Sequence, residues 1–171
     1  MTNSVTIWTI GHSTRAIEEF LALLAQNGIE LVVDVRSLPG SRRYPHFNQE
    51  PLAATLADHR IGYLWLEELG GRRKLVNSTD HSEWRNKAFQ AYAQHMETEA
   101  FRKGAERVIA LAAVQRLALM CAEGLWWRCH RSMIADYLVD RGAIVLHIME
   151  PGSVVPHPRD RLRGGSSLPP P

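Results

Sequence analysis

Residues 5–36 read VTIWTIGHSTRAIEEFLALLAQNGIELVVDVR and carry the clearest folding signal in the chain. Val5 to Ile10 is rich in β-branched and aromatic residues, as is typical of a strand. Apolar residues then recur at helical spacing from Ile17 to Leu24, until Asn27-Gly28 ends the helix. Ile29 to Val35 is a second apolar run that suits a strand covered on both faces. Strand, helix and strand within about thirty residues predict a βαβ unit.

The same alternation continues outward from this unit. Three further strands are predicted at Ile61 to Leu66, Leu117 to Ala122 and Ala143 to Met149. Helical segments are expected between them, at residues 51–60, 84–96, 101–115 and 133–140. Five strands alternating with helices indicate a three-layer α/β fold with a mostly parallel sheet flanked by helices. We expect a single domain over residues 1–155 and a flexible tail rich in Pro, Gly and Arg over residues 156–171.

The charge of the chain is small and unevenly placed. Its 171 residues carry 20 basic and 18 acidic side chains, a formal net charge of +2. Three arginines and one aspartate follow Pro151, so the excess lies in the expected tail and residues 1–150 are balanced. A neutral body is poorly suited to coating long nucleic acid by bulk electrostatics, although a local basic patch remains compatible with it.

Two cysteines cannot form a disulfide framework, and Met1 to Ser4 lacks the basic and apolar regions of a secretion signal. A reducing cytoplasm is therefore the expected location. The apolar run from Val108 to Val114 stops at Gln115-Arg116, far short of the roughly 20 residues that span a bilayer, so no membrane partner is expected.

Unusual polar residues follow four of the predicted strands. Gly11-His-Ser, Asp34-Val-Arg-Ser, Leu69-Gly-Gly and Cys121-Ala-Glu each stand at or just after a strand end. In open parallel sheets, the loops at the carboxyl ends of the strands form the binding crevice. We therefore expect these segments to form a common site.

The densest group of reactive residues spans Met120 to Ser132. Cys121 and Glu123 end a buried strand, whereas Cys129, His130 and Arg131 open a helix. A helix start and neighbouring cations stabilise a thiolate, as a nucleophilic or redox cysteine requires. Burial of Cys121 as a small core residue is the alternative. The two cysteines are eight positions apart with no second pair, unlike structural zinc ligands, so neither a metal nor another cofactor is expected.

Arginines form the second group. The guanidinium of Arg36 starts at the floor of the crevice, where it could bind an oxyanion in a bidentate fork or form an ion pair with Asp34 or Glu123. Arg43 lies beside Tyr44, in a mixture of basic and aromatic residues that is typical of nucleotide or single-stranded nucleic-acid sites. A solvated loop is the alternative for this segment.

Histidine, serine and glycine residues complete the expected site. His12 either faces a ligand or caps the following helix, and Ser13 or Thr14 is the expected helix cap. His12, Ser13 and His130 are counted as ligand-binding candidates together with Arg36, Arg43 and Arg131. Leu69-Gly-Gly is expected to supply a positive φ or a close backbone approach.

The ordered motifs Thr9-Ile-Gly-His-Ser, Val33 to Ser41, Leu69-Gly-Gly and Met120-Cys-Ala-Glu followed by Cys129-His-Arg resemble the family known as domain of unknown function 488. The resemblance extends from Ile7 to Met149. It implies a compact α/β domain, without implying a reaction. The residues that carry it are Gly11, His12, Ser13, Asp34, Arg36, Pro39, Ser41, Phe47, Gly70, Gly71, Cys121, Glu123, Cys129, His130 and Arg131.

Two functions follow as hypotheses. The first is a thiol-dependent hydrolase or transferase acting on a small anionic or nucleotide-like ligand, with Cys129 or Cys121 as nucleophile and Glu123 handling protons. The second is a module that binds nucleic acid or a nucleotide without catalysis. A scaffold with inert cysteines is a third possibility, and the oligomeric state stays open.

Overall fold

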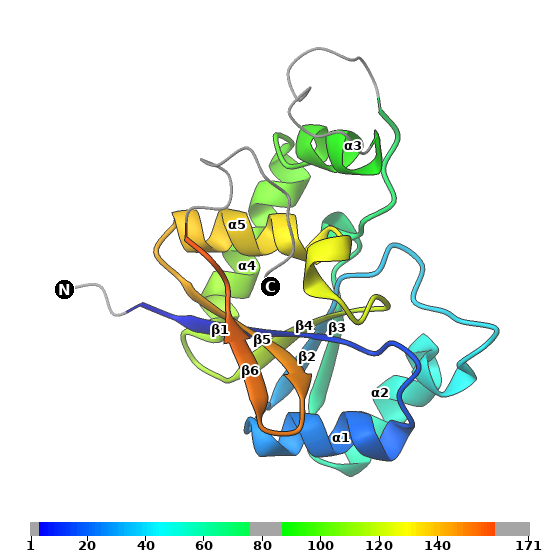
Figure 1. The fold of residues 1–171 in the computed structure, drawn as a ribbon. Helices are drawn as coiled ribbons and strands as arrows, with labels where there is room; N and C mark the ends of the chain where they lie inside the picture. Colours follow the sequence, from blue (N-terminus) through cyan, green and yellow to red (C-terminus); the bar gives the residue numbers. More distant parts are fainter. Residues whose placement is uncertain (1–3, 76–86, 160–171) are drawn as a thin grey trace.

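A computed structural model describes residues 4–75 and 87–159 (Figure 1). One six-stranded sheet forms its centre, in the order β3-β2-β4-β1-β5-β6. The strands are β1 (Thr6–Gly11), β2 (Leu31–Asp34), β3 (Gly62–Trp65), β4 (Leu117–Cys121), β5 (Ile144–Glu150) and β6 (Ser153–Pro156). The helices are α1 (Ile17–Gln26), α2 (Gln49–Asp58), α3 (Lys87–His95), α4 (Glu99–Ala112) and α5 (Arg131–Asp140). Short 3₁₀ turns are η1 (Pro45–Phe47), η2 (Glu67–Leu69) and η3 (Trp126–Arg128).

The strand order explains the three layers. The connections β1 to β2 and β2 to β3 move along the sheet in one direction, whereas β3 to β4 and β4 to β5 move in the other. Because parallel crossovers are right-handed, the two directions place their helices on opposite faces. Figure 1 shows α1 and α2 below the sheet and α3, α4 and α5 above it. Loops leaving β4 and its two neighbours therefore diverge, which opens crevices on both sides of the end of β4.

Each face of the sheet buries its own core. Phe20, Leu24 and Leu52 pack from α1 and α2 against the lower face, and all three are fully buried. Phe101 and Leu138 pack from α4 and α5 against the upper face and are also fully buried. Burial on both faces accounts for the continuous apolar runs of the central strands.

The structure confirms the predicted fold class and adds one strand. β6 pairs antiparallel with β5 at the edge of the sheet and ends at Pro156, a residue that read as the start of the tail. Proline is tolerated there because an edge strand need not donate every hydrogen bond. Residues 160–171 of the expected tail lie outside the described residues.

The expected helix cap is wrong. α1 begins after Ala16, which makes no side-chain capping hydrogen bond. Ser13 instead occupies a turn with φ of 51°, where its backbone N–H donates to the Ala122 carbonyl over 3.0 Å. The turn that leaves β1 is therefore tied to the loop after β4 rather than to the start of α1.

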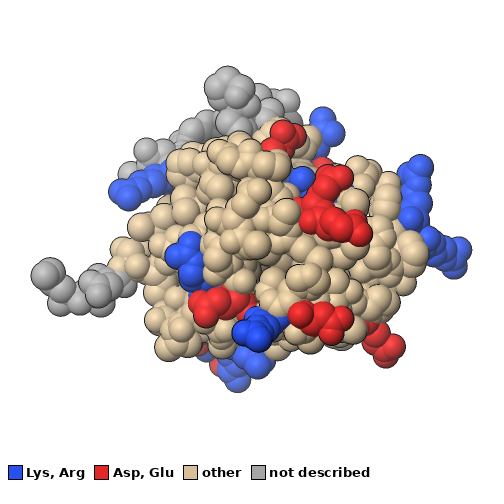
Figure 2. Space-filling view, turned by 90° about the horizontal axis from the view of Figure 1, so that it is seen from below, with Lys and Arg blue, Asp and Glu red and all other residues tan. Residues whose placement is uncertain are grey.

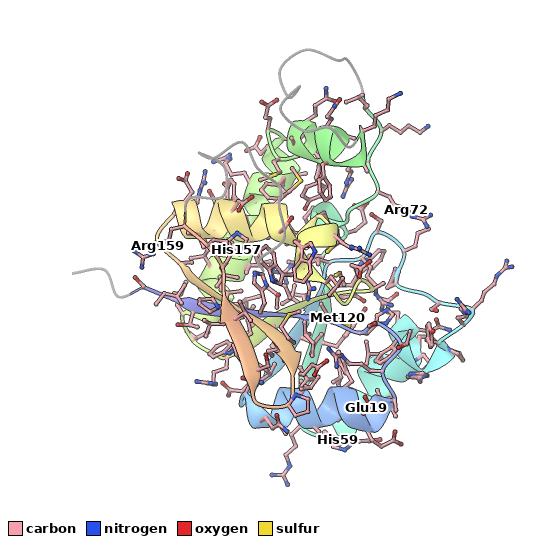
Figure 3. All side chains as sticks on the ribbon, viewed as in Figure 1. Glu19, His59, Arg72, Met120, His157 and Arg159 are labelled. Carbon is pink, nitrogen blue, oxygen red and sulfur yellow. The ribbon has the colours of Figure 1, made fainter. Side chains whose placement is uncertain are left out.

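A buried polar chain joins β1, β5 and the residue after β6 to α5. Thr9 Oγ1 lies 2.6 Å from His147 Nδ1, and His147 Nε2 lies 2.9 Å from His157 Nδ1. His157 Nε2 lies 2.6 Å from a carboxylate oxygen of Asp136 on α5. Figure 3 labels His157 just below α5. These hydrogen bonds connect the edge of the sheet, at β5 and the residue after β6, to α5 in the upper layer.

None of the helices in the described segments is long and apolar enough to cross a membrane. On the side covered by α1 and α2, seen in Figure 2, basic and acidic side chains are interspersed.

Candidate thiol site

A cleft of about 460 Å³ opens beside the end of β4, on the side of β2. We call it the thiol cleft. The loops after β2, β3 and β4, the start of α3 and the residues before α5 surround it. Its lining residues are Arg36, Ser37, Leu38, Gly40, Gly71, Arg72, Ala88, Phe89, Cys121, Ala122, Glu123, Arg128, Cys129 and His130.

The two cysteine thiols touch at the floor of this cleft. Cys121 Sγ, at the end of β4, lies 3.2 Å from Cys129 Sγ, just before α5. Cys121 is 2% exposed and Cys129 is half-buried. The backbone N–H of Arg131 donates to Cys129 Sγ over 3.3 Å. Parallel pairing of Gly11 with Cys121 fixes the first thiol in the sheet, and the start of α5 positions the second against it.

A buried arginine lies beside the thiols. Arg131 is fully buried, and its Nη2 donates to the carbonyls of Glu123 and Gly124 over 3.1 and 3.3 Å. Its Nε and Nη1 have no hydrogen-bond partner in the described structure. No carboxylate of the described residues forms an ion pair with it. A buried cation is costly without an anion, and a thiolate in the adjacent pair would supply one.

The environment shifts the pKa values of the two thiols in opposite directions. A hydrogen bond from Cys129 lowers the pKa of Cys121 to about 7, against the effect of burial, and the charge of Arg131 lowers it further. Burial raises the pKa of Cys129 well above its usual range, and its hydrogen bond to Cys121 raises it more. Cys121 is therefore the thiol of the pair that ionises more readily, and when it is ionised Cys129 is the donor to it.

Arg36 is held in an ion pair. Its Nε and Nη2 donate to the two Asp34 carboxylate oxygens over 2.9 and 2.7 Å, and Nη2 also donates to the Phe47 carbonyl over 2.9 Å. Tyr63 donates to the same carboxylate over 2.5 Å. Burial alone would lower the pKa of Arg36, but the Asp34 carboxylate raises it. Of the two interpretations of Arg36, the ion pair with Asp34 is the one observed, at the edge of the thiol cleft.

Both site histidines are neutral side chains near pH 7. Burial lowers the pKa of His12 and of His130 to about 4. His130 Nε2 lies 2.8 Å from the Val35 carbonyl, so this nitrogen carries the proton and donates. His12 makes the equivalent bond from Nδ1 to the Ser13 carbonyl over 2.9 Å and stacks on Phe47. His130 lines the thiol cleft, whereas His12 lies buried beside Arg36.

The protein-family model described as "Domain of unknown function DUF488" matches residues 16–138 of the chain. The chain belongs to the DUF488 family. No curated protein and no solved structure matches it.

Three glycines among the motif residues of this DUF488 domain pack against the site loops. A Cβ atom at Gly11 would lie 2.0 Å from the Glu123 carbonyl oxygen, and one at Gly71 would lie 2.4 Å from His130 Nδ1. A Cβ atom at Gly70 would lie 2.5 Å from Ser37 Oγ. Gly70 has a φ of −61°, so close approach, rather than a positive φ, explains this glycine. These contacts hold the loops of β1, β2 and β3 against the loop and helix that follow β4.

The DUF488 domain gathers some of the expected site residues and separates others. Glu123 lines the thiol cleft, and one of its carboxylate oxygens accepts from the Leu125 N–H over 3.1 Å. Ser13 lies on the other side of the β4 loop, in a second cavity that Trp126 and Trp127 also line. Arg43 is exposed and lines neither cavity.

Arg72 and Arg128 also line the cleft, although neither is among the candidate residues named from the sequence. Both are exposed side chains at the mouth of the thiol cleft, and Figure 3 shows Arg72 at the periphery of the molecule. Arg72 directly follows the Leu69-Gly-Gly motif, and Arg128 directly precedes Cys129, so proximity to a motif was the available signal. Within residues 4–75 and 87–159, no three His, Cys, Asp or Glu side chains gather as metal ligands do.

Proposed function

We propose that this DUF488 domain is a thiol-dependent transferase or hydrolase, with Cys121 as its nucleophile and a small anionic molecule as its substrate. The observation that carries the proposal is the 3.2 Å contact between Cys121 and Cys129 beside the buried Arg131. Donation from one thiol and a nearby fixed cation leave Cys121 ionised near neutral pH, where a thiolate reacts and a thiol does not.

The chemistry divides into two displacements. In the first, the Cys121 thiolate attacks an electrophilic centre of the substrate, a bond to sulfur forms, and the leaving group departs with its bonding electrons. In the second, water or an acceptor displaces Cys121, and the Glu123 carboxylate takes the proton of the attacking group. The returning thiolate regains the hydrogen bond from Cys129 and the charge of Arg131, which makes Cys121 a good leaving group.

The charges around the cleft favour an anionic substrate. Arg72 and Arg128 stand at its mouth as exposed cations that can reach a bound anion. Arg36 also lines the cleft, but Asp34 already neutralises its charge. A volume of about 460 Å³ accommodates a small molecule.

Two alkylating reagents of similar size and different charge test the proposal. Ordinary thiols react more slowly with the anion iodoacetate than with neutral iodoacetamide. We expect Cys121 to be alkylated with a midpoint near pH 7, and to favour iodoacetate more than glutathione does under the same conditions. Peptide mapping by mass spectrometry assigns the modified residue.

Charge-removing variants provide the controls. Arg128→Gln and Arg72→Gln should each reduce the preference for iodoacetate several-fold and leave the iodoacetamide rate nearly unchanged. Lys103→Gln, at an exposed position on α4, should change neither rate. Two results would overturn the proposal: a Cys121 that reacts no faster than glutathione at pH 7, or a reagent preference equal to that of glutathione.

A further inference from the structure

We infer that Cys121 and Cys129 are a redox pair that closes to an intramolecular disulfide when a hydroperoxide enters the thiol cleft. Their sulfur atoms are 3.2 Å apart. A disulfide bond is about 2.05 Å long, so the two atoms need to approach by only about 1.1 Å. The proposed function uses Cys121 alone as a nucleophile and does not require this reaction.

The backbone around the pair allows this approach. Cys121 is fixed in the sheet by its pairing with Gly11, so Cys129 is the partner that moves. Cys129 lies outside regular structure, with extended backbone angles (φ −136°, ψ 172°), between η3 and α5. The seven residues between the cysteines close a short loop rather than joining distant parts of the chain. Closure therefore needs a local adjustment before α5 and no rearrangement of the sheet.

The first chemical step belongs to Cys121. Its thiolate attacks the terminal oxygen of the hydroperoxide, an S–O bond forms and the O–O bond breaks. The alkoxide or hydroxide that leaves takes a proton from solvent, and Cys121 becomes a sulfenic acid. Arg131 stabilises the attacking thiolate, and the cleft gives a small peroxide access to it.

The second step belongs to Cys129. Its sulfur attacks the Cys121 sulfur, an S–S bond forms, the S–O bond breaks, and the departing hydroxide leaves as water with the Cys129 proton. Two electrons have then passed from the thiol pair to the peroxide. Burial continues to oppose ionisation of Cys129, but its hydrogen bond to a charged Cys121 is gone while Arg131 remains. Oxidation of the first thiol therefore activates the second.

Closure would also switch the proposed activity off, because a disulfide sulfur is no longer the nucleophile. Reduction by a dithiol would restore it. Two different measurements distinguish the redox inference from the proposed function. Disulfide formation is measured by mass and does not depend on any substrate, whereas the proposed function is measured by the preference of reduced Cys121 for an anionic electrophile.

The test uses the reduced full-length chain, treated with one equivalent of hydrogen peroxide and then alkylated with iodoacetamide under denaturing conditions. We expect a monomer about 2 Da lighter than the reduced chain, with no alkyl group and with Cys121 linked to Cys129 in the peptide map. Dithiothreitol should return both thiols to full alkylation. The chain has only two cysteines, so the linkage is unambiguous.

The matched variant is Cys129→Ser, which preserves size and a hydrogen-bond donor but cannot resolve a sulfenic acid. In this variant peroxide should leave Cys121 as a sulfenic acid that dimedone traps, at least tenfold more than in the unmodified chain. Equal trapping in both proteins, a disulfide-linked dimer, or direct conversion of the unmodified chain to a sulfinic acid would each overturn the inference.

Discussion

Arg131 determines the electrostatics of the thiol site. Its guanidinium is fully buried, and its Nε and Nη1 have no hydrogen-bond partner among the described residues, while the acceptors of Nη2 are neutral carbonyls. Burying such a group is unfavourable unless an anion lies near it. An ionised Cys121 would meet this requirement, because the charge of Arg131 lowers the pKa of that thiol.

Replacing Arg131 should raise the pKa of Cys121. In Arg131→Met the positive charge disappears, and we expect the alkylation midpoint to move up by about one pH unit, from near pH 7, which lowers the rate at pH 7 about fivefold. Arg131→Lys keeps the charge and should retain most of the rate. A thermal unfolding curve of each variant verifies that it is folded, and Cys129→Ala, which removes only the donor to Cys121, should shift the midpoint in the same direction. An unchanged midpoint in folded Arg131→Met would exclude this role for the arginine.

The loops around the site are held together by close packing between elements. Gly71, after η2, leaves no room for a side chain because a Cβ atom there would lie only 2.4 Å from His130 Nδ1. His130 in turn donates to the Val35 carbonyl at the end of β2 and is the N-cap residue of α5. The loops after β2 and β3 and the start of α5 therefore share one packed contact beside Cys129.

Gly71→Ala should disturb this contact and destabilise the protein. A Cβ atom 2.4 Å from the imidazole must displace His130, and overpacking of this kind costs about 1–3 kcal/mol. Gly40→Ala is the control, because its Cβ would meet only Asn48 Oδ1 at an ordinary 3.7 Å. Urea denaturation measures both variants. Equal midpoints would show that the loop accommodates a methyl group and that the contact does not hold the site together.

At the scale of the whole molecule, charges of both signs are distributed along the chain and over the one face that Figure 2 shows. Residues 1–150 are electrically balanced, and the face in Figure 2 mixes both signs. Arg42 and Arg43 are exposed, and neither lines the thiol cleft. This distribution favours a discrete site for a small anion over a surface for a polyanion.

We therefore expect no electrophoretic shift of a single-stranded or duplex oligonucleotide at 150 mM salt. A basic interface would bind at low salt and lose affinity steeply as salt rises. A salt-sensitive shift that Arg42→Gln and Arg43→Gln abolish would instead support the nucleic-acid-binding alternative. A second form that ends at Pro158 keeps the buried His157 and reports whether the three arginines after it contribute.

Local sequence patterns predicted most of the fold. The period-3.6 and continuous apolar patterns of residues 5–36 gave the βαβ unit, and the same alternation gave the helices and the mostly parallel sheet. The edge strand β6 was not predicted, because Pro151-Gly152 and Pro156 have the composition of a tail. The role of Ser13 in the turn after β1 was not predicted either, because its hydrogen bond to the Ala122 carbonyl depends on β4 lying next to β1.

The sequence also identified Cys121, Glu123, Cys129 and Arg131 as one group, because they stand at a strand end and a helix start. It left open whether Arg36 binds a ligand or Asp34, and which cysteine is the nucleophile. The structure shows the ion pair between Arg36 and Asp34, whereas the choice of Cys121 as nucleophile remains our proposal. The insertion of β4 between β1 and β2 decides which of the reactive residues meet in space. It set Cys121 against Cys129 and buried Arg131 beside them, and such contacts arise from strand order and layer packing, which no local pattern of residues encodes.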